Sequence, residues 1–129
     1  MHKYGMQPPG YETYPVAREW SGPPPLPQKW LELVASKVEN DPSISVYIHL
    51  PFCENTCDFC ERNTLAPNGL RLPRRYLEAV MKEWTLYAGA FPRKPVIQAL
   101  HLVGGTPTYF RPEELEHLVG HILSSARLA

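Results

Sequence analysis

Two apolar stretches, each followed by an amphipathic segment, constrain the fold of this chain most strongly. Residues 43–50 and 96–103 are dominated by β-branched and other apolar side chains, a pattern typical of strands that are buried on both faces of a sheet. Apolar residues then recur at helical spacing after Pro73 and again after Pro112, and proline suits the first turn of a helix. The order strand, helix, strand, helix predicts an α/β fold with parallel strands joined by right-handed connections.

The N-terminal part is expected to be an arm and a short helix rather than a further domain. Residues 1–28 are rich in proline, glycine and tyrosine, and a helix is expected from about residue 27 to residue 38. We therefore divide the chain into residues 1–42, the arm and helix, and residues 43–129, which hold the two strand–helix units. Two such units cannot close a sheet. The second strand is therefore expected to have an open edge, and the chain to be a truncated piece of a larger fold.

The composition argues against several classes of partner. The formal net charge is +0, so nothing favours binding to nucleic acid or to an anionic membrane. No segment has the length and apolar purity of a transmembrane helix, and residues 1–15 lack the apolar core of a secretory signal. We therefore expect a cytoplasmic protein with no nucleic-acid partner and no membrane partner.

All three cysteines of the chain, Cys53, Cys57 and Cys60, lie in the loop that follows the first predicted strand, with the spacing C-x3-C-x2-C. In a reducing compartment such a cluster does not indicate a disulfide framework, and thiolates at this spacing favour a soft metal or an iron–sulfur cluster. A structural zinc site normally has four protein ligands, whereas three thiolates leave one position open. A small zinc module, with His49 or Asp58 as the fourth ligand, stays an alternative.

A second unusual loop, Gly104-Gly-Thr-Pro107, follows the second predicted strand. Loops at the carboxyl ends of parallel strands lie at the same edge of a sheet, so the glycines and the cysteines are expected to face one pocket. Glycine allows a ligand to approach the backbone closely, and free N–H groups can bind a carboxylate. A simple turn at the end of a strand is the plainer alternative.

Three further segments extend the pattern: Tyr11-Glu-Thr-Tyr-Pro15, Tyr47-Ile-His-Leu-Pro-Phe-Cys53 and Gly104-Gly-Thr-Pro-Thr-Tyr109. With the cysteine spacing they resemble the radical S-adenosylmethionine enzymes and, within these, the oxygen-independent coproporphyrinogen III oxidases. The resemblance runs from about residue 10 to residue 122, and members of that family are several times longer. It implies a partial parallel (β/α) barrel of the TIM type, to which residues 43–129 would supply the first two βα units.

The resemblance also implies two cofactors. A 4Fe–4S cluster would be held by Cys53, Cys57 and Cys60, and its fourth iron would bind S-adenosylmethionine, so that the open position belongs to the cofactor. An electron from the cluster then cleaves S-adenosylmethionine to give a 5′-deoxyadenosyl radical. The residues that the resemblance places beside S-adenosylmethionine are Tyr47, Phe59, Gly104, Gly105 and Thr106.

The activity that the resemblance implies is oxidative decarboxylation of the propionates of a porphyrinogen in haem biosynthesis. The implied partners are a tetrapyrrole substrate and an electron donor such as flavodoxin or ferredoxin, and no catalytic residue is assigned. Two positions depart from the family pattern: Arg62 stands where a further cysteine is usual, and Val103 stands where a third glycine is usual. A related haem-binding chaperone and another tetrapyrrole-acting radical enzyme therefore remain alternatives.

Overall fold

The computed structural model describes residues 23, 26–55, 65–67, 69 and 71–129. The elements, in chain order, are α1 (Pro27–Asn40), β1 (Ser43–Leu50), α2 (Arg71–Ala90), β2 (Val96–Gly104), a 3₁₀ turn (Pro107–Tyr109), α3 (Pro112–Ser124) and β3 (Arg127–Leu128).

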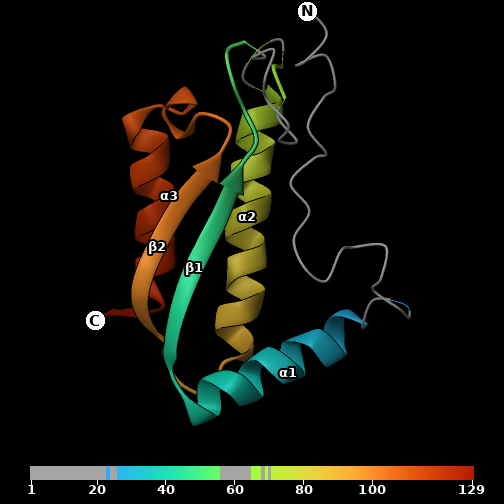
Figure 1. Cartoon of the computed structure of the whole chain (residues 1–129), viewed down its shortest axis with the longest axis vertical. Helices are drawn as coiled ribbons and strands as arrows, with labels where there is room; N and C mark the ends of the chain where they lie inside the picture. The colour runs from blue at the N-terminus through green and yellow to red at the C-terminus, as the bar shows by residue number, and fades with distance from the viewer. Residues whose placement is uncertain (1–22, 24–25, 56–64, 68, 70) are drawn as a thin grey trace, which may run out of the picture.

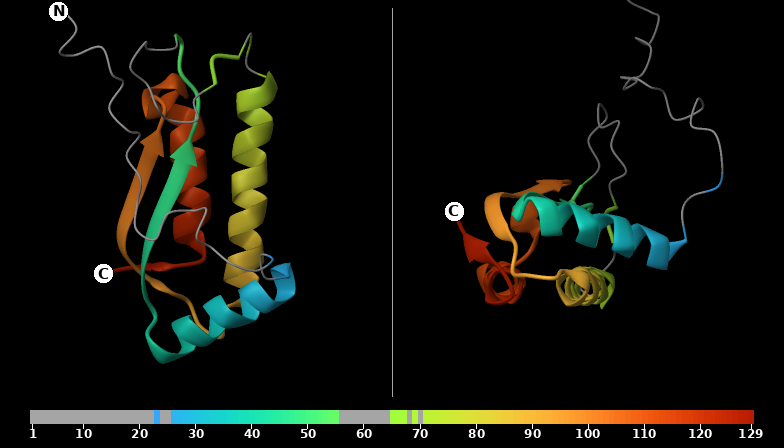
Figure 2. Two further views of the ribbon diagram at one scale, coloured as in Figure 1. Left: turned by 45° about the vertical axis from the view of Figure 1, so that its right-hand side comes forward. Right: turned by 90° about the horizontal axis from the view of Figure 1, so that it is seen from below.

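The three strands form a parallel sheet in the order β1-β2-β3, and α2 and α3 lie together on one face of it (Figures 1 and 2). Helix α1 crosses below the amino ends of β1 and β2, where it packs against the far end of α2 (Figure 1). The predicted α/β class with parallel strands is confirmed. None of the described helices is long and apolar enough to span a membrane.

The short strand β3 was not predicted from the sequence. It pairs with the start of β2, where Val96 lies opposite Arg127 and Ile97 opposite Leu128. The expectation of an open edge on the second strand is therefore wrong for this part of β2. A strand of two residues is too short to have a periodicity of its own, and backbone pairing alone defines it.

The two long strands bury one face only, which corrects the expectation of burial on both faces. Ile48 and Leu50 of β1 are buried beneath the helices, whereas Tyr47 between them is 61% exposed. Tyr47 lies opposite His101 of β2, which is also exposed. Successive side chains of a strand point to opposite faces, so Tyr47 and His101 lie on the face of the sheet that α2 and α3 leave open.

The core lies between the sheet and the two helices. Leu77 and Trp84 of α2 are buried, as the predicted apolar stripe required, and the indole Nε1 of Trp84 donates a hydrogen bond of 2.7 Å to the hydroxyl of Ser125. Leu118 and Ile122 of α3 are completely buried. Burial of such side chains, at roughly 25 cal/mol per Å² of apolar surface, is the main favourable contribution to folding.

Helix α2 begins two residues earlier than its sequence suggested. It starts at Arg71, and Pro73 lies buried within its first turn. Proline is tolerated there because the backbone N–H groups of the first turn have no intrahelical acceptor.

Candidate functional site

The cysteine loop begins directly after β1, and the chain returns at Leu65 to pair with the residues that follow β1. Phe52, which is 1% exposed, forms an isolated parallel bridge with Leu65. The N–H of Cys53 donates to the carbonyl of Leu65 at 3.0 Å, and the N–H of Leu65 donates to the carbonyl of Pro51 at 2.6 Å. These bonds hold Cys53 at the end of β1 and join it to the returning chain. The predicted residues Cys57, Phe59 and Cys60, and Arg62 with them, lie outside the described residues.

The loop after β2 continues the ladder with β1 beyond the ends of both strands. The N–H of Gly105 donates to the carbonyl of Leu50 at 2.8 Å, and the N–H of Thr106 donates to the carbonyl of Phe52 at 2.9 Å. The two loops therefore meet at the carboxyl edge of the sheet, as expected for parallel strands.

The approach of the two loops requires glycine at residues 104 and 105. Gly104 has a φ of +123°, which a residue with a side chain rarely adopts. A Cβ atom on Gly105 would lie 2.5 Å from the carbonyl oxygen of Phe52 and 2.9 Å from the Sγ of Cys53. Gly105 thus has to be glycine because its backbone lies against the first cysteine of the motif.

Thr106 brings a hydroxyl to the same cysteine. Its Oγ1 is 3.6 Å from the Sγ of Cys53, within hydrogen-bond range for a sulfur acceptor. Cys53 and Thr106 line a pocket of about 270 Å³ at this edge of the sheet. The other residues that line it are Glu54, Asn55, Thr108 and Tyr109.

An aromatic cluster supports the pocket from below. The ring of Phe52 packs edge-on against Tyr76 and Phe110, with centroid distances of 5.4 and 5.6 Å, and lies 5.9 Å from the ring of Tyr109. The hydroxyl of Tyr76 donates a hydrogen bond of 2.7 Å to the carbonyl of His49. Burial raises the pKa of Tyr76 above its usual value, and the Glu83 carboxylate adds to this, so Tyr76 remains a neutral donor.

A charged cluster joins the two helices beside the site. One carboxylate oxygen of Glu114 accepts from the Nε of Arg74 at 3.2 Å and lies 3.5 Å from a guanidinium nitrogen of Arg111. The other accepts from the backbone N–H of Arg111 at 3.1 Å. Chiefly through this backbone hydrogen bond, the pKa of Glu114 is lowered. Glu114 thereby connects the first turns of α2 and α3.

The predicted site residues do not all line this pocket. Cys53 and Thr106 do, and Gly104 and Gly105 form the turn next to them. Tyr47 lies on the open face of β1 and is not among the residues that line the pocket. Thr108 and Tyr109 were not assigned a role from the sequence, although they stand in the same segment, Gly104-Gly-Thr-Pro-Thr-Tyr109, as Gly104. The 3₁₀ turn that follows Thr106 places them at the pocket.

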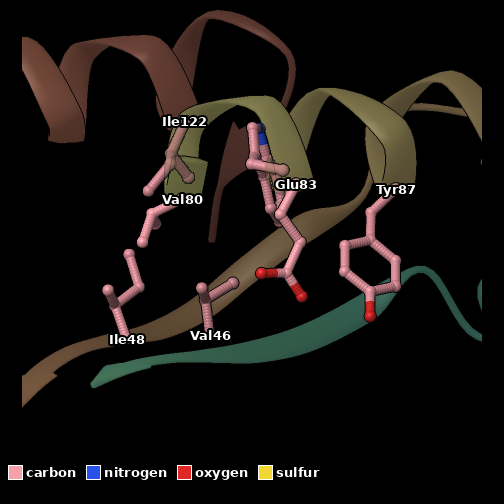
Figure 3. A pocket seen from close by; sticks show the side chains of 7 residues that line it. Val46, Ile48, Val80, Glu83, Tyr87 and Ile122 are labelled. Atoms are coloured by element: carbon pink, nitrogen blue, oxygen red, sulfur yellow. The ribbon is translucent and has the colours of Figure 1, made fainter. Parts of the chain in front are cut away.

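A second cavity, of about 100 Å³, lies between β1 and the two helices (Figure 3). Val46 and Ile48 point toward Val80 and Ile122, and the carboxylate of Glu83 enters from α2. The cavity is lined mainly by apolar side chains and lies away from the cysteine loop. Unlike this cavity, the pocket at Cys53 has groups that could bind a metal or a polar cofactor.

Of the cysteine motif, the described residues at the carboxyl edge of the sheet include Cys53, and a thiolate is the type of ligand that a soft metal or an iron–sulfur cluster takes. Cys53 lines the pocket, and the glycine turn lies so close to it that a Cβ on Gly105 would be 2.9 Å from the Sγ of Cys53. Within the described part of the chain no group of three or more metal-binding side chains gathers, and the other two cysteines of the motif fall outside that part.

Comparisons of the sequence and of the structure with known proteins point to the same group of enzymes. No family model matches the chain. A search of solved structures finds coproporphyrinogen III oxidase from Escherichia coli, described as a radical SAM enzyme, with a TM-score of 0.73 and 30% identity over 93% of this chain. The chain resembles the oxygen-independent coproporphyrinogen III oxidases.

Curated proteins of that name show the same relationship. The oxidase of Escherichia coli is 34% identical over 122 residues, which cover 92% of this chain and 25% of the relative. The oxidase of Synechocystis is 32% identical over 129 residues, and that of Pseudomonas aeruginosa is 28% identical over 129 residues. Each of these two alignments covers 28% of the oxidase. The chain therefore spans about a quarter of the length of the coproporphyrinogen oxidases that it matches.

Proposed function

We propose that this chain contributes the cofactor-binding edge of a radical S-adenosylmethionine oxidoreductase, which decarboxylates the propionates of a porphyrinogen oxidatively, as in haem biosynthesis. The observation that carries the proposal is the contact between the two loops: Thr106 and Gly105 lie against Cys53, the first cysteine of the C-x3-C-x2-C motif. A cysteine that lies against a turn from a second loop places a cluster ligand next to residues that could contact an external ligand of the open iron.

In this proposal Cys53, Cys57 and Cys60 hold a 4Fe–4S cluster and leave one iron without a protein ligand. When bound, the cluster would supply the electron for reductive cleavage of S-adenosylmethionine, and this would provide the radical chemistry that acts on the substrate. The described residues join the starts of the two loops, because buried Phe52 and the backbone bonds to Leu50 and Phe52 hold residues 105 and 106 beside residues 52 and 53.

The residues around the cluster would bind the cofactor. Gly104, Gly105 and Thr106 would receive the amino and carboxylate ends of S-adenosylmethionine, because this turn lies beside Cys53 at the pocket. The N–H groups of Gly105 and Thr106 already donate to the carbonyls of Leu50 and Phe52, so they are not the groups that would bind the carboxylate. Phe59 would lie against the adenine. Tyr47 would lie beside the cofactor from the open face of the sheet, where its side chain is exposed rather than packed in a core.

The names of the relatives support a substrate class, and the proposed reaction requires an electron donor. A tetrapyrrole is the substrate class, since the proteins that the chain resembles are named as coproporphyrinogen oxidases. A one-electron donor such as flavodoxin or ferredoxin would reduce the cluster. A cytoplasmic location accompanies the proposal, because clustered thiols keep their metal in a reducing compartment.

The test of this proposal is reconstitution of the chain with iron and sulfide in the absence of oxygen. We expect bound iron and sulfide, and cleavage of S-adenosylmethionine on reduction. Replacement of Cys57 by alanine is expected to abolish the cluster. Stoichiometric zinc without sulfide would identify a zinc module instead. A cluster that cleaves no S-adenosylmethionine, together with tight haem binding, would identify a haem-binding relative.

A further inference from the structure

We propose that the hydroxyl of Thr106 donates a hydrogen bond to the sulfur of Cys53 and thereby raises the reduction potential of the iron–sulfur cluster that Cys53 helps to hold. This inference rests on the proposed function, since it requires the cluster. It gives Thr106 a role toward the metal, in addition to the role toward S-adenosylmethionine that the sequence suggested. Thr106 acts here as a tuning residue, because it touches a ligand of the cluster rather than the reacting atoms.

The first observation behind this proposal is the short distance between the side chains of Thr106 and Cys53. The Oγ1 of Thr106 lies 3.6 Å from the Sγ of Cys53, although the two residues are 53 positions apart in the sequence. A metal-bound cysteine is a thiolate, which has no proton to give, whereas a threonine hydroxyl can donate one. The hydroxyl is therefore the donor and the sulfur the acceptor.

The backbone holds both partners of this bond in place. The N–H of Thr106 donates to the carbonyl of Phe52 at 2.9 Å, next to Cys53 itself. The N–H of Cys53 donates to Leu65, and the carbonyl of Thr106 accepts from the N–H of Tyr109 at 2.9 Å. Threonine is β-branched and has few side-chain conformations, so a fixed backbone leaves its hydroxyl little freedom.

The electrostatic consequence has a definite sign. A hydrogen bond to a ligating sulfur withdraws negative charge from the cluster, and the reduced cluster carries one more negative charge than the oxidised one. The bond therefore stabilises the reduced form more strongly and raises the potential. Removal of the hydroxyl is expected to make the cluster harder to reduce.

Three substitutions separate the hydroxyl from the other features of the site. Thr106→Val keeps the shape of the side chain and removes the hydrogen-bond donor. Because Thr106 is exposed, water could replace a deleted hydroxyl, and the second methyl group of valine occupies that position. Thr106→Ser keeps the donor. Thr108→Val removes a hydroxyl that lines the same pocket without a hydrogen bond to Cys53 among the described residues, and serves as the matched control.

The measurement is the midpoint potential of the reconstituted cluster, obtained by a redox titration followed by electron paramagnetic resonance in the absence of S-adenosylmethionine. For Thr106→Val we expect an equilibrium constant for reduction that is lower on the order of tenfold, equivalent to about 59 mV for a one-electron couple. Thr106→Ser and Thr108→Val are expected to keep the wild-type potential. Iron content is measured on every variant.

Several results would overturn the inference. Equal potentials for Thr106→Val and the wild type would show that the hydroxyl does not act on the cluster. Equal shifts in the valine and serine variants, or a similar shift in Thr108→Val, would assign the effect to packing. If the valine variant holds no cluster, Thr106→Ala and Thr106→Ser make the same comparison, and equal potentials for these two refute the proposal.

The two proposals fail in different ways. A wild-type chain that binds no iron and sulfide contradicts the proposed function, and the inference about Thr106 falls with it. A cluster that forms, cleaves S-adenosylmethionine and keeps its potential in Thr106→Val contradicts only the inference.

Discussion

The hydroxyl of Tyr76 in α2 donates a hydrogen bond of 2.7 Å to the backbone carbonyl of His49 in β1. In the described sheet β1 is an edge strand, so the carbonyls on its outer side have no neighbouring strand to bond. Tyr76 satisfies one of them at the point where β1 approaches Cys53. The side chain thereby ties the beginning of α2 to the strand that carries the first cysteine.

Substitution of Tyr76 by phenylalanine tests this connection. The ring and its edge-on contact with Phe52 stay, but the carbonyl of His49 loses its donor, so we expect a loss of about 1 kcal/mol in the free energy of unfolding. Urea denaturation measures the change. Tyr47→Phe is the matched control: its side chain is 61% exposed, and a change within about 0.5 kcal/mol is expected. Equal effects of the two substitutions would show that the bond to His49 contributes nothing.

A side chain at residue 105 is expected to disturb the site itself. A Cβ atom there would lie 2.5 Å from the carbonyl oxygen of Phe52 and 2.9 Å from the Sγ of Cys53, so Gly105→Ala must displace the first cysteine. We expect less iron in the reconstituted protein as well as weaker binding of S-adenosylmethionine.

The control for this experiment is Gly120→Ala in α3. A Cβ at Gly120 meets no atom within 4 Å, and alanine is a better helix former than glycine, so stability should rise by up to about 1 kcal/mol with unchanged iron content. Wild-type iron content in Gly105→Ala would mean that the two loops lie farther apart than described.

The charged cluster at Glu114 predicts a dependence of stability on pH. The folded protein lowers the pKa of Glu114, chiefly through the backbone N–H of Arg111. A carboxyl whose pKa is lower in the folded than in the unfolded protein stabilises the fold at pH values above the pKa of the unfolded state. This stabilisation is lost as the pH falls through the pKa of the folded state. Glu114→Gln should therefore cost about 0.5–1 kcal/mol near pH 7, and the difference from the wild type should vanish in acid.

Thermal or urea unfolding at several pH values measures this effect. Glu113→Gln is the matched control, because Glu113 occupies the same first turn of α3 but makes none of the contacts with Arg74 and Arg111 that Glu114 makes. A constant difference between Glu114→Gln and the wild type at all pH values would contradict the electrostatic explanation.

The interior of the helix layer predicts a large effect at Leu118. This side chain is completely buried between α3 and the sheet, so Leu118→Ala removes apolar contacts and leaves a cavity, at a cost of about 2–5 kcal/mol. Leu86→Ala in α2 removes the same atoms from a side chain that is 63% exposed and should cost far less. Similar losses in urea denaturation would show that Leu118 is not part of the core.

The elements of this fold could be predicted from the sequence because their signals are local. The expected strand at residues 43–50 has the bounds of β1, and the expected helix after Pro112 begins at that residue. The apolar stripe after Pro73 correctly predicted that Leu77 and Trp84 face the core. The assumption of burial on both faces failed at Tyr47, because a run of apolar residues does not show what covers each face.

The sequence by itself also determined that the cysteine motif and the glycine turn follow parallel strands, and hence that they lie at one edge. Which atoms meet there was decided only by the tertiary structure. The register between β1 and β2 shifts by one residue between Ile44 and Ser45, and this irregularity places Thr106 beside Phe52 and Cys53. A slip of one residue would turn each side chain of a strand to the opposite face, so the contact between Thr106 and Cys53 depends on pairing that no local pattern specifies.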